Sequence, residues 1–366
     1  MNPQIVRNEK AMTIPQNKIQ LSRQKILIVK LQYVGDTMSV VPVVAALKRH
    51  APGLTVDVLI HKECAELIAH HSDIRKVWVY DRDQAKKSFF STITYHLPLI
   101  AKLRREKFDI VIALTQGERP FFLSLATGAP VRLTYRIASV ITRMMNAIPE
   151  GKTTRRHFIE VDVDILRYFG IENREVNLMI PIPEEVRARI LKRLALVISP
   201  GQTTVAIHPG ARKKTRQWKP ERFAQITARL RDRYGAAIVL LGGADEQGLL
   251  DDIERLMGFP AALKSSSLSL LDMAAVFAEC RLFIGNDSGP GHIAAAVGCP
   301  TLSLFGPNYP VLCRPYSASG EVIFKNLDCC GCRQEEHLCV RPDDTCMDLI
   351  SVDEVWSAAQ KILEGK

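Results

Sequence analysis

The chain has 366 residues, of which 47% are hydrophobic and 24% charged, so the composition excludes a disordered or fibrous protein and predicts two domains of ordinary size. The net charge of +10 favours anionic partners, which are nucleic acid, phosphorylated small molecules or an anionic membrane face, without choosing among them. No run approaches the roughly 18 uninterrupted apolar residues of a membrane span. Residues 1–20 also lack the apolar core of a secretory signal, so we expect a cytoplasmic protein.

The N-terminal half alternates short apolar runs with segments of helical spacing. The runs that indicate strands are residues 25–31, 55–60, 77–80, 108–114 and 131–135, and helices are expected at 37–50 and 155–169. Strands that alternate with helices predict a parallel sheet covered on both faces. Pro181 and Pro183 then predict a linker, with a new helix from Glu184.

The second half repeats this order. Strands are expected at 205–208, 237–241, 281–285 and 301–305, and helices from about residues 220, 245, 270 and 288, with a last helix at 352–363. We therefore predict an α/β protein with two Rossmann-like, doubly wound domains that face each other across a cleft, and ligands beyond the carboxyl ends of the strands. The predicted parts are an extension (1–24), two domains (25–180 and 181–350) and a helix that packs across the junction (351–366).

Residues 84–160 contain thirteen Lys or Arg against five Asp or Glu, and so carry +8 of the net charge. A set of solvated helix faces would explain this run. The alternative is a surface for a phosphorylated or membrane-bound substrate.

The loop at residues 285–298, GNDSGPGHIAAAVG, follows a strand and opens a helix of small residues. Its unpaired N–H groups and the positive end of the helix dipole favour a phosphate. Candidate ligand contacts are Asp287, Ser288, Gly289, Gly291 and His292; alternatively, Asp287 or Ser288 only caps the helix.

Two other phosphate motifs are weaker. The same loop matches the dinucleotide pattern G-x-G-x-x-A, but no Asp or Glu lies between residues 288 and 320 to hold a ribose, so a nicotinamide enzyme is disfavoured. Residues 149–153 are similar to a P-loop but Asn146 stands where its first glycine belongs.

Three further loops follow predicted strands. After the strand that ends at His208, the cations Arg212, Lys213, Lys214 and Arg216 precede a helix start, where they favour a diphosphate; the alternative is a solvated basic loop. Gly35 and Asp36 follow the first strand, and Asp36 either caps a helix or acts as a base toward an incoming hydroxyl. Glu246 follows a glycine turn and is a candidate for hydrogen bonds to a ribose or base.

Cysteines are concentrated near the C-terminus. Cys329, Cys332, Cys339 and Cys346 have a spacing that could supply four thiolates to zinc, although unpaired thiols in a buried loop would give the same pattern.

The chain resembles the lipopolysaccharide heptosyltransferases, glycosyltransferase family 9, over about residues 25–363. The resemblance rests on four loops in order: KILIVKLQYVGDTMSVVPVVAALK, HPGARKKTRQWKPERF, LLGGADEQ and FIGNDSGPGHIAAAVGCPTLSLFGP. It implies a GT-B fold, an ADP-heptose donor, an anionic lipopolysaccharide inner-core acceptor, inversion at the anomeric carbon and no required cofactor or metal. It also implies a cytoplasmic enzyme peripheral to the inner membrane, and no nucleic-acid partner.

Residue by residue, the resemblance implies that Asp36 is the catalytic base and that Asp287, Ser288, Gly289 and His292 form the donor-binding string. Glu246 would bind the ribose. The family usually has Lys where this chain has Arg216, which would stabilise the departing diphosphate, with Lys213 or Lys214 as alternatives. Two rivals stay open: the same reaction with another nucleotide sugar or acceptor, and a non-catalytic nucleotide-binding protein.

Overall fold

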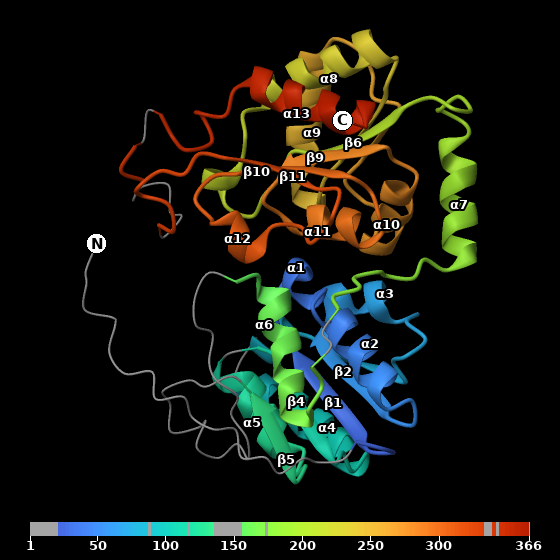
Figure 1. Cartoon of the computed structure of the whole chain (residues 1–366), viewed down its shortest axis with the longest axis vertical. Helices are drawn as coiled ribbons and strands as arrows, with labels where there is room; N and C mark the ends of the chain where they lie inside the picture. The colour runs from blue at the N-terminus through green and yellow to red at the C-terminus, as the bar shows by residue number, and fades with distance from the viewer. Residues whose placement is uncertain are drawn as a thin grey trace.

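The N-terminal lobe is built on a five-stranded sheet. The computed structural model describes residues 21–86, 89–115, 117–134, 156–172, 175–332, 339–341 and 344–365 (Figure 1). The strands lie in the order β3-β2-β1-β4-β5 and all pairs are parallel. Their bounds are β1 Lys25–Lys30, β2 Thr55–His61, β3 Lys76–Tyr80, β4 Ile110–Ala113 and β5 Val131–Thr134. The predicted end of β5 at Tyr135 lies outside the described residues.

Helices cover both faces of this sheet, as the alternation of strands and helices predicts. On β1, Ile26 and Ile28 belong to one apolar cluster, while Leu27 and Val29 belong to another on the opposite face. The helices are α1 Val34–Thr37, α2 Val40–His50, α3 Ala65–Ile68, α4 Phe89–Arg105, α5 Glu118–Ala126 and α6 Phe158–Asp164, with 3-10 turns η1 Lys62–Cys64, η2 Gln84–Lys86 and η4 Ile165–Phe169.

The helix expected at residues 37–50 begins at Val40, and a separate short helix, α1, ends at Thr37. Thr37 Oγ1 donates to the carbonyl of Tyr33 at 3.0 Å, and Ser39 Oγ donates to the carbonyl of Asp36 at 2.9 Å. These side chains compete for backbone groups at the end of α1. Pro42 then occupies the first turn of α2, where its missing N–H costs little.

A buried ion pair joins β1 to α6. Lys30, at the end of β1, donates to Asp162 at 2.5 Å and to the carbonyl of Leu114 at 3.2 Å. Both charged side chains are almost fully buried, at 1% and 0% exposure. The contact fixes α6 beside the carboxyl end of the central strand.

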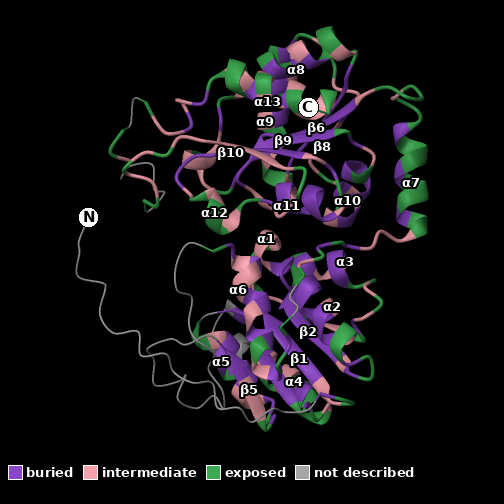
Figure 2. Cartoon of the chain, in the orientation of Figure 1, coloured by how far each residue is buried: buried purple, intermediate pink, exposed green. Residues whose placement is uncertain are grey.

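The C-terminal lobe has a six-stranded parallel sheet in the order β11-β10-β9-β6-β7-β8. Its strands are β6 Thr204–His208, β7 Ala237–Leu241, β8 Leu263–Ser265, β9 Leu282–Asn286, β10 Thr301–Phe305 and β11 Glu321–Phe324. Its helices are α7 Glu184–Leu194, α8 Pro220–Tyr234, α9 Gln247–Met257, α10 Leu270–Ala278, α11 Gly289–Ala296, α12 Pro310–Cys313 and α13 Val352–Glu364, with 3-10 turns η5 Lys214–Arg216 and η6 Ala244–Glu246. Figure 2 shows the strands of both sheets largely buried.

In the part of the chain that the structure describes, the last helix packs on the C-terminal lobe and not across the junction as predicted. Val355 and Ala359 of α13 are buried in a cluster whose members all lie between residues 205 and 363. Arg229 of α8 also donates to Asp353 at 2.6 Å. The apolar stripe of α13 therefore faces α8 and the second sheet, at the end of the molecule far from the other lobe (Figure 1).

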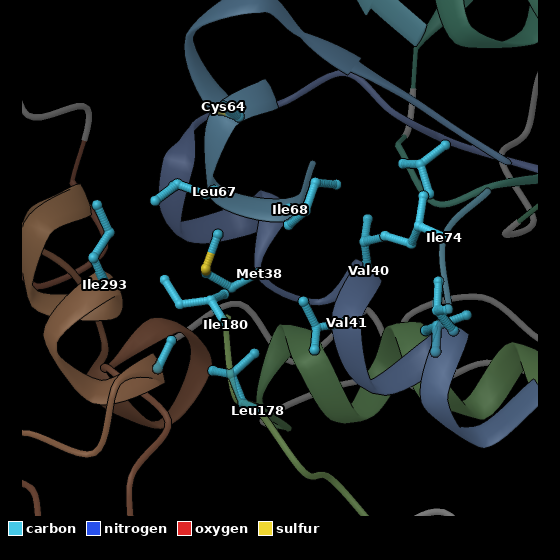
Figure 3. Packing of buried hydrophobic residues seen from close by; sticks show 14 of the residues in the cluster. Met38, Val40, Val41, Cys64, Leu67, Ile68, Ile74, Leu178, Ile180 and Ile293 are labelled. Atoms are coloured by element: carbon cyan, nitrogen blue, oxygen red, sulfur yellow. The ribbon is translucent and has the colours of Figure 1, made fainter. Parts of the chain in front are cut away.

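Part of the contact between the two lobes is apolar. Figure 3 shows Met38 and Leu67 of the N-terminal lobe beside Ile293 of α11, with Leu178 and Ile180 of the connecting segment packed between them. The amide of Ile180 donates to the carbonyl of Ala296 at 3.0 Å. None of the described helices has the length and apolar character that crossing a membrane requires.

Candidate active site

The carboxyl ends of the two sheets face each other, and this arrangement brings Asp36 close to the loop after β9. Asp36 is half-buried in α1, which packs against α11 of the other lobe. Asp287 follows β9 and is only 6% exposed. Burial raises the pKa of Asp287, Arg216 and Asn308 oppose this, and the charge of Asp36 raises it further. The loop of Asp36 and the loop of Asp287 therefore meet where α1 packs against α11.

Asp287 is held by two partners from separate loops. Arg216 Nη1 lies 3.1 Å from its Oδ2, and Asn308 Nδ2 donates to the same oxygen at 2.5 Å. Arg216 is 19% exposed and stands in η5, directly before the segment that leads into α8. The arrangement keeps a guanidinium next to the start of α11, as a site for a diphosphate requires.

The start of α11 leaves polar atoms without protein partners. Ser288 is the N-cap residue, yet its side chain makes no capping hydrogen bond. Its Oγ and the Nδ1 of His292 are buried and have no hydrogen-bond partner among the described residues. Unsatisfied buried groups are costly, so their grouping at a helix N-terminus indicates a ligand that would complete them.

Two glycines allow α1 and α11 to touch. A Cβ on Gly35 would lie 2.6 Å from Cδ2 of His292, and one on Gly289 would lie 3.1 Å from Cβ of Val34. Because real Cβ atoms essentially never approach within 3.0 Å, position 35 accepts only glycine without a shift of the imidazole. The loop that carries Asp36 thus rests directly on the donor-side helix.

His208 and Glu246 form a second group at the ends of β6 and β7. His208 Nε2 lies 3.6 Å from Glu246 Oε2, and this oxygen accepts a hydrogen bond from the amide of Gly243 at 2.7 Å. The carboxylate lies over Gly210, where a Cβ would fall 1.8 Å from Oε1. Burial lowers the pKa of His208, and its Nδ1 lacks a partner among the described residues. A neutral imidazole beside a carboxylate suits hydrogen bonds to a ribose or base.

The basic loop is fixed by Trp218. This side chain is 2% exposed, and its Nε1 donates to the carbonyl of Ile350 at 2.9 Å. The Trp218 amide donates to Asn286 Oδ1 at 3.1 Å, and Asn286 Nδ2 donates to the carbonyl of Pro209 at 2.6 Å. Asn286 thus ties the basic loop to the loop of Asp287.

The cations of this loop do not all point the same way. Arg216 faces Asp287, Lys213 is half-buried, and Lys214 is exposed in η5. Arg212 reaches Tyr33 in the N-terminal lobe, with its guanidinium carbon 3.9 Å from the ring centroid. No described contact joins Gly291 to the other candidates; a Cβ there would lie 3.2 Å from Cγ of Pro315.

Sequence reasoning missed Asn286 and Asn308. Asn308 follows β10, the neighbour of β9, so the rule that post-strand loops meet at one edge could have found it. Asn286 is the last residue of β9 and is absent from the predicted set because an amide inside a strand has no special sequence signal.

The structure does not group Cys329, Cys332, Cys339 and Cys346, the candidate zinc ligands, around a common point. Among the described residues, which include all four cysteines, no group of three or more His, Cys, Asp or Glu is placed to hold a metal ion. Cys332 is exposed, whereas Cys346 lies beneath Gly306. Burial and the neighbouring thiols raise the pKa of Cys346 to about 11.

The chain is similar to members of one known protein family. The model of glycosyltransferase family 9 (heptosyltransferase) matches residues 97–340. Lipopolysaccharide heptosyltransferase 3 of Escherichia coli is 26% identical over 296 residues, which cover 78% of this chain and 85% of that protein. Lipopolysaccharide heptosyltransferase 1 of Pseudomonas aeruginosa is 25% identical over 322 residues, covering 84% and 86% respectively.

Solved structures share the architecture. A glycosyl transferase family 9 protein from Veillonella parvula superposes with a TM-score of 0.84 at 22% identity, over 96% of this chain and 100% of that one. The E. coli heptosyltransferase WaaC with ADP has a TM-score of 0.73 at 18% identity, over 92% and 99%. This likeness confirms the expected GT-B fold with two Rossmann-like lobes.

Proposed function

The chain belongs to glycosyltransferase family 9, the heptosyltransferases, and from this premise we propose that it transfers heptose from ADP-heptose to the inner core of lipopolysaccharide. The transfer inverts the anomeric carbon and uses no metal ion. The support is the named activity of relatives that match most of the chain, together with one observation: α1, which carries Asp36, packs against α11, and Arg216 pairs with Asp287 directly before the start of α11.

The proposed chemistry assigns one task to each side of the junction. Asp36 takes the proton of the acceptor hydroxyl as its oxygen forms a bond to the anomeric carbon. The bond from that carbon to the diphosphate breaks on the opposite face, and its electron pair leaves with ADP. Arg216 and the N–H groups of α11 stabilise the negative charge that develops on the diphosphate.

The donor nucleotide is proposed to lie on the C-terminal lobe. Its diphosphate would satisfy Ser288 Oγ and His292 Nδ1, which lack partners among the described residues. Its ribose would contact Glu246 and His208 at the ends of β6 and β7. Lys213 and Lys214 belong to the same basic loop as Arg216 and would add positive charge near the diphosphate.

The acceptor side is proposed to be the N-terminal lobe, divided from the donor lobe near residue 180. Because a lipopolysaccharide precursor is anchored in lipid, the enzyme would work in the cytoplasm at the face of the inner membrane. The positive charge of residues 84–160 supports attraction to such a surface.

Calorimetric titration with ADP, UDP, GDP and NAD tests the donor class. We expect ADP to bind at least tenfold more tightly than UDP or GDP, and NAD to bind weakly because the nicotinamide half has no place beside α11. Preferential binding of UDP or GDP would replace the proposed donor, and absence of binding by all four would remove the nucleotide-sugar function.

A transfer assay tests the reaction itself. Incubation with ADP-heptose and heptose-deficient lipopolysaccharide should release ADP only when the acceptor is present. ADP release that is independent of acceptor would indicate hydrolysis rather than transfer.

A further inference from the structure

Arg212 belongs to the basic loop after β6 but is not directed at the proposed diphosphate site. It stacks on Tyr33, which lies three residues before Asp36 and is 52% exposed. Arg82, from the loop after β3, also reaches Tyr33, with its guanidinium carbon 5.9 Å from the centroid of the same ring. Hydrogen bonds and charge from Arg82 and Arg212 lower the pKa of Tyr33. Guanidinium groups from both lobes therefore converge beside the loop of the proposed base.

A third arginine extends this group across the edge of the N-terminal sheet. Arg119 of α5 places its guanidinium carbon 5.7 Å from the ring centroid of Tyr80, the last residue of β3. His61, the last residue of β2, has its ring 5.7 Å from that of Tyr80. Its side chain is 9% exposed, and its Nδ1 has no hydrogen-bond partner among the described residues. The buried Nδ1 of His61 thus has no partner among the described residues, and the charges of Arg82 and Arg119 act on this ring.

Nearby carboxylates do not neutralise these arginines. In the part of the chain that the structure describes, Arg82, Arg119 and Arg212 form no ion pair with Asp or Glu. Asp81 accepts hydrogen bonds from the amides of Asp83 and Gln84 and lies 3.4 Å from Lys62 Nζ. Glu63 is the carboxylate whose charge acts on His61, against the charges of Arg82 and Arg119.

We propose that Arg82, Arg119 and Arg212, arranged around Tyr33, Tyr80 and His61, form a second anion site that binds a phosphate group carried by the acceptor. Guanidinium groups grip phosphate oxygens in pairs, and the unpartnered imidazole nitrogen supplies one more hydrogen bond. The ends of β2 and β3 lie at the sheet edge from which Asp36 also projects, so a phosphate bound there would hold the acceptor beside the base. This proposal rests on the proposed transfer function. It assigns Arg212 to the binding of the acceptor rather than to the binding of the donor diphosphate.

Titration of inorganic phosphate into the full-length protein, with ADP present at saturation, isolates this site because ADP fills the donor site. We expect the wild-type protein to bind phosphate under these conditions and to bind acetate far more weakly. The double variant Arg82→Gln/Arg119→Gln should bind phosphate at least tenfold more weakly, while its affinity for ADP stays within twofold of wild type.

A matched control separates the site from net charge. Arg187 and Arg189 on α7 are 53% and 58% exposed and pair with Glu279 and Asp272 of the C-terminal lobe. The variant Arg187→Gln/Arg189→Gln removes the same charge far from the site and should leave phosphate binding unchanged. An equal loss of phosphate affinity in both double variants would overturn the inference.

Steady-state kinetics provide the second readout. We expect Arg82→Gln/Arg119→Gln to raise the acceptor KM at least tenfold, with kcat within threefold of the wild-type value. With an acceptor from which the phosphates have been removed, the wild-type protein and the double variant should show the same KM. If the double variant fails to fold, as judged by its unfolding midpoint, Tyr33→Phe tests the same contact and should raise the acceptor KM several-fold.

The outcomes distinguish the two proposals. ADP binding and transfer with an unchanged acceptor KM in these variants would refute the phosphate site and leave the transferase function in place. Absence of ADP binding in the wild-type protein would refute the transferase function first.

Discussion

At the scale of single residues, the contacts of Asp287 favour an indirect part in donor binding. Its carboxylate is buried and engaged by Arg216 and Asn308, so it is placed to orient the guanidinium. A carboxylate next to a diphosphate is repelled unless a cation lies between them. We therefore interpret Asp287 as a positioning residue for Arg216.

Replacing Asp36 tests the proposed base. Asp36→Asn keeps the size of the side chain but cannot take a proton, so transfer should fall by roughly 100- to 10,000-fold, the usual contribution of a general base. The Kd for ADP should change by less than about twofold, because the amide stays on the acceptor side. Rapid-quench transfer assays and calorimetry provide the two values. Turnover near that of the wild type would remove Asp36 from the mechanism.

Arg216→Ala tests the stabilisation of the leaving group. Loss of the guanidinium should lower kcat by about 100-fold, the order found when one charge-stabilising donor is removed. Asp287 would then lie buried without its cation, which raises its pKa further. Arg216→Lys should recover part of the rate. If both variants kept wild-type rates and ADP affinity, Lys213 or Lys214 would become the candidates.

The predicted site residues were found because each follows a strand in a loop of distinctive composition. Asp36, Arg216, Asp287 and His292 are brought to one junction, although their catalytic and binding roles stay predictions. Asn308 and the stacking of Arg212 on Tyr33 depend on which loops of two separate sheets meet. A single sequence does not encode that pairing in any local pattern.

At the scale of the elements, the pair formed by Lys30 and Asp162 couples the central strand to α6. Both groups have lost contact with water, so each depends on the other for compensation of its charge. This contact positions the N-terminal end of α6, where His157 Nε2 lies 2.8 Å from the carbonyl of Arg314 in the other lobe. One buried pair thus supports a contact between the lobes.

Breaking that pair should be costly. Asp162→Ala leaves the Lys30 ammonium buried without its partner, and we expect a loss of about 3–5 kcal/mol in the free energy of unfolding. Urea unfolding followed by circular dichroism gives this value. Asp353→Ala, which breaks an exposed pair with Arg229, should cost less than about 1 kcal/mol. Similar small losses in both variants would show that water reaches the Lys30 site.

Most strands and helices could be predicted from apolar periodicity, including the start of α7 at Glu184 and of α8 at Pro220. The short strands β8 and β11 were missed because three or four residues at a sheet edge give no clear pattern. The break between α1 and α2 depends on side-chain hydrogen bonds of Thr37 and Ser39, which periodicity does not report. Amphipathic spacing predicted that α13 is a helix but not which surface covers its apolar stripe.

At the scale of the whole molecule, buried histidines make stability depend on pH. Burial, with a smaller contribution from His157, lowers the pKa of His292 from 6.5 to about 3. Between these values the unfolded chain binds a proton at this residue and the folded chain does not. Stability therefore falls as the pH drops from about 6.5 toward 3, by about 1.4 kcal/mol per pH unit for one such group.

Comparing two histidine variants checks this dependence. The loss in the free energy of unfolding between pH 6.5 and pH 4.5 should be about 2 kcal/mol smaller in His292→Gln than in wild type. His50→Gln, which changes an exposed histidine, should keep the wild-type loss. Identical pH profiles for all three proteins would mean that His292 is protonated in the folded state.

The apolar contact between the lobes also restricts how chimaeric enzymes can be assembled. One buried apolar cluster spans both lobes and includes Met38, Leu67, Leu178, Ile180 and Ile293. A chimaera joined at the linker would therefore pack two lobes from different proteins against each other. The imidazole of His292 leaves no space for a side chain at position 35. The contact between α1 and α11 therefore does not tolerate a residue larger than glycine from another protein at this position. A hybrid designed to accept a new glycan should therefore carry residues 34–38, 64–68 and 176–182 from the parent that supplies α11.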